Sequence, residues 1–363
     1  MNFLRKQNGL STFSILIIIA IIIAAILCLV LLTNRPKQDL NSTQNSKDVL
    51  VGFSITTLQE ERWEKDKSEF LKRADELGMV VDLETAQNDV KKQVSQLEAM
   101  IAKGVDVIVV VPLDANSLTD VLDKAHKAGI KIISYDRMVN NAPIDVYLSF
   151  DNEKVGEYQA QYVMDTLKDK IKSGSNLKVA YVGGSDLDNN ALTLRKGSFK
   201  ILQPLIDNKS IEIVYDKYTK DWNPDIAYSG IKDYLKKNNG KIDAVIAAND
   251  GTAFGVITAL SELGLSGKIP VSGQDAELAA ARRIIAGTQT MTVYKPILKL
   301  ASSAAETAFA LANGKIVKTN SMVNNGRVDV PSILLIPTAV TKSNIDDTLI
   351  KDGYHTREDI YKK

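Results

Sequence analysis

Polar and aromatic side chains that could bind a small neutral molecule stand where predicted strands end. Asp136 and Arg137 directly follow the apolar run KIISY, and Asp275 follows the run IPVSGQ. Carboxylates and amides accept hydrogen bonds from hydroxyl groups, basic groups donate to hydroxyl oxygens, and indole faces cover the C–H surface of a ring. This chemistry predicts a site for a neutral polyol. The candidate ligand-binding residues are Arg62, Trp63, Asp136, Arg137, Asp188, Asn190, Trp222, Asn249, Asp275 and Lys295.

Two of these residues have an alternative interpretation as helix caps. Asp188 and Asp275 each precede a predicted helix, and aspartate is a preferred residue at that position. For each residue taken alone, the cap and the binding role both stay open. Capping is a much weaker explanation for all ten candidate residues taken together.

Catalysis and metal binding find no support in the sequence. The chain has two histidines: His126 lies among lysines on a predicted solvent-exposed helix face, and His355 lies in a charged tail. No G-x-S-x-G, H-E-x-x-H or P-loop motif occurs. The segment GGSDLDNNA resembles the start of a calcium loop, but Ala191 replaces the required glycine and Gly197 stands where the bidentate glutamate belongs. We therefore predict no enzyme activity, no cofactor and no metal.

Strands and helices alternate from residue 49 onward, which is typical of a parallel sheet covered on both faces. Two passages share the same pattern of strand, polar loop, helix, strand and acid, one ending at Asp136 and the other at Asp275. Two similar α/β lobes facing one another would place these acids at equivalent strand ends. Ligands of open α/β sheets bind outside those ends.

The N-terminal segment has a different character. Residues 13–32 form an apolar run without a charged residue, long enough to span a bilayer, after a short segment 1–12 and before a polar linker 33–48. Leu27 precedes Cys28, the only cysteine, which disfavours lipidation there. A retained transmembrane anchor is therefore predicted. The 45 basic and 44 acidic residues nearly cancel, so no overall field recruits nucleic acid.

Several segments together resemble the periplasmic xylose-binding proteins of the type I sugar-binding solute-binding family. They include ERWEKD, YDRM, SFDNEKVGE, GGSDLDNNA, AANDGTA, SGQDAELA and NNGRVDVPS. The resemblance implies two Rossmann-like lobes joined by three crossovers. The first lobe would comprise 49–150 plus about 296–330, and the second 151–295 plus about 331–363. It also implies that Trp63 and Trp222 sandwich a pyranose to which the other eight candidate residues hydrogen-bond.

The resemblance and the apolar run lead to one functional expectation with two partners. The chain would be a D-xylose receptor outside the cytoplasm, held on the cell membrane by a single span. A tether raises the effective concentration near a membrane partner, which favours signalling to a sensor histidine kinase. The alternative is delivery of xylose to an ABC permease, and a sugar-modifying enzyme is a weaker third hypothesis.

Overall fold

The computed structural model describes residue 23 and residues 48–362, within two separate units, Met1–Lys47 and Asp48–Lys363. The predicted anchor at 13–32 lies, except for Ile23, outside the described residues. Among the helices that are described, none combines the length and the apolar character needed to cross a membrane.

The first lobe is built on a seven-stranded sheet in the order β10-β11-β5-β4-β3-β1-β2. Neighbouring strands are parallel except β10 and β11. The strands are β1 Val49–Ile55, β2 Met79–Thr85, β3 Val107–Val110, β4 Lys131–Tyr135, β5 Val146–Phe150, β10 Ser321–Asn324 and β11 Asp329–Leu335.

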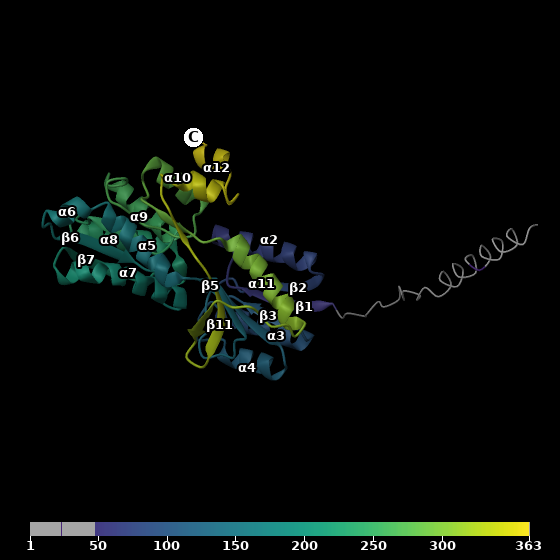
Figure 1. The fold of residues 1–363 in the computed structure, drawn as a ribbon. Helices are drawn as coiled ribbons and strands as arrows, with labels where there is room; N and C mark the ends of the chain where they lie inside the picture. Colours follow the sequence, from purple (N-terminus) through teal and green to yellow (C-terminus); the bar gives the residue numbers. More distant parts are fainter. Residues whose placement is uncertain (1–22, 24–47, 363) are drawn as a thin grey trace, which may run out of the picture. The chain divides into compact units, whose positions relative to one another are not determined.

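Helices cover both faces of this sheet, as the alternating pattern predicts (Figure 1). One face carries α2 Glu61–Glu76 and α11 Ile297–Ala312, and the other carries α3 Val90–Lys103 and α4 Thr119–Lys127. Alternate residues of each strand serve the two cores: Val107 packs on the α2 side and Ile108 on the α3 side. The central strands β3 and β5 are therefore buried along their whole length, because neither face of the sheet meets water there.

The second lobe is built on a parallel sheet in the order β7-β6-β8. These strands are β6 Leu177–Val182, β7 Ile211–Lys217 and β8 Ala244–Ala247. The predicted strand IPVSGQD contributes only a single parallel bridge, from Val271 to Val245. A separate antiparallel pair joins β9 Thr292–Tyr294 to β12 Thr338–Val340. The helices are α5 Asn152–Asp165, α6 Lys168–Lys172, α7 Asn189–Asp207, α8 Pro224–Lys237, α9 Asp250–Glu262 and α10 Leu278–Ala286.

The chain passes between the lobes after β5, after β9 and after β11. The last passage comes after Leu335, a few residues beyond the expected boundary at about 330. β11 continues to Leu335 in the first sheet, where it pairs in parallel with β5. The register explains the shift, because the backbone of Ser332–Leu335 completes the hydrogen bonding of β5. After β12, a π-helical turn at Asp346–Ile350 and α12 Arg357–Tyr361 end the fold, with α12 next to α10.

Candidate functional site

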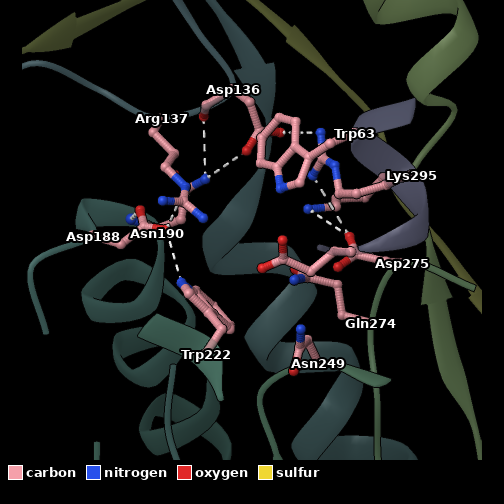
Figure 2. A pocket seen from close by; sticks show the side chains of 12 residues that line it. Trp63, Asp136, Arg137, Asp188, Asn190, Trp222, Asn249, Gln274, Asp275 and Lys295 are labelled. Carbon is pink, nitrogen blue, oxygen red and sulfur yellow. Dashed lines mark hydrogen bonds and ion pairs between the residues drawn. The ribbon is translucent and has the colours of Figure 1, made fainter. Parts of the chain in front are cut away.

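The ten predicted binding residues all line one cavity between the two lobes, with about 310 Å³ of empty space, part of it open to solvent (Figure 2). The first lobe contributes residues from the start of α2 and the end of β4, and the second contributes residues from the starts of α7 and α9 and from nearby turns. Figure 2 shows Trp63 in the upper part of the group and Trp222 in its lower part. Folding thus brings together residues that are more than two hundred positions apart in sequence, because each follows a strand or begins a helix at the facing edges of the lobes.

Asp136 is the hydrogen-bonded centre of the cavity. It has a left-handed backbone with φ 60°, and its Oδ2 accepts a 2.8 Å hydrogen bond from Arg62 Nη2. Its Oδ1 accepts from Asn190 Nδ2 at 3.2 Å. Burial alone would raise the pKa of Asp136, but the charges of Arg62, Lys295 and Arg137 outweigh it and hold the pKa below its ordinary value. Asp136 is therefore an anion whose lone pairs are partly used by the protein itself.

Arg62 connects this centre to the interior of the first lobe. Its Nε donates to Asp66 Oδ2 at 3.2 Å, and the Tyr135 hydroxyl donates to the other oxygen of Asp66. Burial raises the pKa of Asp66 to about 6, against the opposing charge of Arg62. The Arg62 guanidinium also lies 4.3 Å from the ring centroid of Trp63, a cation–π distance. Arg62 is thus fixed on three sides before any ligand contact.

Contacts between the lobes fix the opposite wall of the cavity. Arg137 Nε lies 2.8 Å from Asp188 Oδ2, and Trp222 Nε1 donates to the same oxygen at 3.2 Å. Asp188 Oδ1 also accepts from the backbone of Asn190 at 2.9 Å and so caps α7. Burial raises the pKa of Asp188 against the charge of Arg137. For this residue the cap and the cavity role coexist.

A pair of glycines positions Asn190. Gly156 of α5 and Gly197 of α7 let the two helices touch, since a Cβ at either residue would lie 1.9 Å from a backbone oxygen of the other helix. The close approach lets Asn152 Nδ2 donate to Asn190 Oδ1 at 2.9 Å. That bond turns the amide nitrogen of Asn190 toward Asp136. Gly197, which stands where a calcium loop would have its bidentate glutamate, is therefore a helix-packing residue.

The helix-cap alternative is correct for Asp188 and wrong for Asp275. The residue at the N-cap of α10 is Glu277, and its side chain makes no capping hydrogen bond. Instead Glu61, from α2 of the first lobe, accepts a 3.0 Å bond from Leu278 N. Asn249, which the sequence analysis assigns only to binding, forms a capping box with Thr252 at the start of α9.

Asp275 has fewer hydrogen bonds than Asp136. Lys295 Nζ lies 3.0 Å from Asp275 Oδ1 and Arg62 Nη1 lies 3.6 Å from it, yet neither contact is aligned as a hydrogen bond. Two other buried cavity oxygens, Gln274 Oε1 and Glu60 Oε2, also accept no hydrogen bond from the described residues. Buried acceptors of this kind are suited to the hydroxyl donors of a polyol.

Glu60 and Gln274 are the cavity residues that the sequence analysis missed. Gln274 directly precedes Asp275, and Glu60 lies two residues before Arg62. The same strand-end reasoning could have found both, because neighbours in a sharp turn can face one cavity. Burial raises the pKa of Glu60, although Arg137 lowers it.

The two histidines lie outside this cavity. His126 is exposed on α4, as predicted. His355, in the charged C-terminal tail, is buried, and its Nε2 lies 2.8 Å from Ala276 O, because the tail folds against the turn that holds Asp275. Among the described residues, no group of three or more His, Cys, Asp or Glu side chains is arranged to hold a metal ion.

Comparison with known proteins assigns the fold to a family. A family profile described as "Periplasmic binding protein domain" matches residues 51–316. The chain belongs to this periplasmic binding protein family. It is 48% identical over 320 residues to the D-xylose-binding periplasmic protein of Escherichia coli strain K12, covering 88% of this chain and 95% of that protein. It is 36% identical to the multiple sugar-binding periplasmic receptor ChvE of Rhizobium radiobacter, covering 85% of this chain and 92% of that one.

A solved structure of a family relative has the same architecture. The ABC transporter solute binding protein of Clostridium phytofermentans with bound β-D-glucose superposes with a TM-score of 0.80 at 30% identity, covering 86% of this chain and 99% of that chain. The two-lobed α/β fold implied by the sequence is thereby confirmed.

Proposed function

We propose that this protein is an extracytoplasmic receptor for D-xylose and that it catalyses no reaction. The observation that carries the proposal is the interlobe cavity, in which donors, unpaired acceptors and two indoles from both lobes converge. The 48% identity to a protein named for D-xylose binding supports the choice of sugar.

In this proposal the lobes close on the sugar, because only the closed arrangement offers it contacts from both sides. Asp275, Gln274 and Glu60 accept hydrogen bonds from its hydroxyl groups, and Lys295 and Arg137 donate to its oxygens. Trp63 and Trp222 cover its C–H surfaces. The contacts of Arg137 with Asp188 and of Asn190 with Asp136 hold the lobes together around it.

Calorimetry tests the sugar. The full-length protein is expected to bind xylose with a Kd on the order of micromolar, about −8 kcal/mol. Glucose should bind clearly more weakly, because its extra hydroxymethyl group must fit between the same two tryptophans. Equal affinities for the two sugars would refute xylose as the cognate ligand.

Two alternative membrane partners are each supported by a different observation. The apolar run at 13–32 supports a retained anchor and, with it, signalling to a sensor histidine kinase. The name of the Clostridium relative, an ABC transporter solute binding protein, supports delivery to an ABC permease. In either case the partner would distinguish the closed from the open lobes by touching both.

Fractionation and affinity capture separate these partners. A retained anchor keeps the full-length protein in membranes through a carbonate wash, whereas N-terminal sequencing that begins near Cys28 would refute it. Capture of the native complex with and without xylose then identifies the partner. Xylose-dependent recovery of a kinase supports sensing, and recovery of permease subunits alone supports transport.

A further inference from the structure

The turn that carries Asp275 has a strained backbone over two residues. Asp275 has φ 91° and Ala276 has φ 53°, both in the left-handed region. Residues with a Cβ atom rarely adopt this conformation, and the surrounding structure must hold them in it. On the strand side, Asp275 N donates to Val293 O at 2.9 Å and Ala276 N donates to Thr292 Oγ1 at 3.2 Å. The carbonyl groups of the turn are held by a different part of the chain.

The C-terminal tail, residues 341–362, supplies the donors for these carbonyl groups. The Tyr354 hydroxyl donates to Asp275 O at 3.3 Å, and His355 Nε2 lies 2.8 Å from Ala276 O. A carbonyl oxygen only accepts hydrogen bonds, so Nε2 carries the proton. Burial lowers the pKa of His355, so the ring is a neutral donor at neutral pH. Two buried side chains of the tail thus hold the two left-handed residues.

The equivalent turn of the first lobe is held in the same way by other residues. The carbonyl oxygen of Asp136 accepts hydrogen bonds from the Tyr147 hydroxyl at 3.0 Å, from Ser149 Oγ at 2.6 Å and from Asn190 Nδ2 at 3.1 Å. Tyr147 and Ser149 belong to β5, the strand next to β4 in the same sheet. In the second lobe, the tail takes the place of β5 behind the acid.

Contacts with both lobes fix the position of the tail without a ligand. The Tyr354 ring packs on Tyr294 of β9, with ring centroids 5.0 Å apart. From α2 of the first lobe, Lys65 Nζ lies 3.8 Å from the Tyr354 ring centroid and donates to Tyr354 O at 3.3 Å. From α10 of the second lobe, Arg282 Nε donates to Asp359 O at 2.7 Å. The tail is therefore a fixed support for the turn.

The support acts from outside the sugar cavity. Asp275 lines the cavity, whereas Tyr354 and His355 do not. Hydrogen bonds weaken steeply when their distance or angle is lost, so a turn released from the tail would present its carboxylate less well to a hydroxyl group.

We propose that Tyr354 and His355 are positioning residues for sugar binding. They hold the Asp275 turn in the left-handed conformation that directs its carboxylate into the cavity. The inference rests on the proposed function, since the sugar must bind to Asp275.

Calorimetry on the full-length protein with xylose tests the two residues. Tyr354→Phe removes the hydroxyl and keeps the ring, and it should weaken xylose binding by about two- to tenfold. His355→Ala should weaken it at least as much, and His355→Gln, whose amide nitrogen can donate to the same carbonyl, should recover most of the affinity. Tyr361→Phe is the matched control, because it removes a tail hydroxyl that bonds to Asp346 Oδ1 at 2.8 Å, and it should leave the affinity unchanged.

A double-mutant cycle shows whether the tail acts through Asp275. Asp275→Gly removes the carboxylate, and glycine adopts the left-handed backbone without strain. In that background Tyr354→Phe should change the xylose affinity by less than about twofold, because the group that it positions is gone. The same fold loss in both backgrounds would overturn the positioning role and leave Tyr354 a merely structural residue.

The outcomes separate this inference from the proposed function. If the wild type binds xylose and both Tyr354→Phe and His355→Ala bind it equally well, the positioning role is overturned and the receptor proposal stands. His355→Gln binding as weakly as His355→Ala would likewise overturn the role of the His355 hydrogen bond. Failure of the wild type to bind xylose would refute the receptor proposal and this inference with it.

Discussion

Asp136 and Asp275 occupy equivalent turns of the two lobes but are held in different ways. Asp136 follows β4 of the first lobe, and Asp275 follows the strand segment of Val271 in the second lobe. Both have a left-handed backbone, with φ 60° for Asp136 and 91° for Asp275. Asp136 accepts hydrogen bonds from Arg62 and Asn190, whereas Asp275 Oδ1 has only the unaligned cations of Lys295 and Arg62. Equivalent positions in similar lobes therefore need not have the same role.

The difference distinguishes Asp136, whose carboxylate is hydrogen-bonded within the protein, from Asp275, whose Oδ1 is free to accept a hydrogen bond from a ligand. Removing Asp136 takes away the shorter of the two carboxylate hydrogen bonds of buried Arg62 and leaves it with Asp66 alone, and the cost of that falls on folding. Asp275 Oδ1 accepts no aligned hydrogen bond from the protein, so the loss of Asp275 should be felt more strongly when a hydroxyl ligand binds, although it also removes the ion-pair partner of buried Lys295. Both acids should matter for xylose, and Asp136 should matter more for stability.

Asp136→Ala should have the largest effect. We expect a loss of about 3–5 kcal/mol in the free energy of unfolding, as for other buried ion pairs broken on one side, together with loss of xylose binding. Urea unfolding and calorimetry measure the two quantities. A stability loss no greater than that of Asp275→Ala would remove the distinction between the turns.

Asp275→Asn should weaken xylose binding by about 1–3 kcal/mol while lowering the free energy of unfolding by less than Asp136→Ala does. Asparagine keeps the side-chain shape and tolerates the left-handed backbone, so the turn should persist. Calorimetry with xylose gives the first value and urea unfolding gives the second. Normal affinity would show that Asp275 is only an ion-pair partner.

The two turns should also respond oppositely to pH. The lowered pKa of Asp136 means that its stabilising contribution is present above the unfolded value, about 3.9, and is lost as the pH falls through the folded pKa. Next to Asp275, burial raises the pKa of Asp250 to about 7 and that of Glu277 to about 8. The folded state then binds more protons than the unfolded state, so stability should fall as the pH rises from about 4 toward 8.

Glu277→Gln isolates this second trend, because its side chain makes no capping hydrogen bond that the change would break. The wild-type decline should not exceed about 1.4 kcal/mol per pH unit for each group, and the variant should decline less steeply. Urea unfolding at a series of pH values measures both slopes. Identical slopes would mean that Glu277 titrates alike in the folded and unfolded chains.

Glu61→Gln should have the smallest effect, a two- to fivefold loss of xylose affinity. Glu61 lines neither cavity, but it caps α10 of the second lobe from α2 of the first. Losing the charge at that helix end should disfavour the closed lobes. His126→Ala, on an exposed helix face, is the control expected to change nothing.

Local sequence patterns were enough to predict the lobes and the cavity residues. Alternating apolar runs and helical stripes predict the two α/β lobes, since a strand buried on both faces must be apolar throughout. Polar residues just after such strands predict the cavity, because parallel strands end at one edge of their sheet. The ten candidate residues were found in this way, and Glu60 and Gln274 lay within reach of the same reasoning.

Only the tertiary structure decided which partner each polar group has. The capping of α10 by Glu61, the burial of His355 and the continuation of β11 beside β5 each join segments far apart in the chain. The same holds for the contrast between Asp136 and Asp275, which have similar sequence contexts but different neighbours from the opposite lobe, Asn190 for Asp136 and Arg62 for Asp275. Sequence periodicity determines which face of an element is buried, whereas hydrogen-bond satisfaction depends on side chains that meet only after folding.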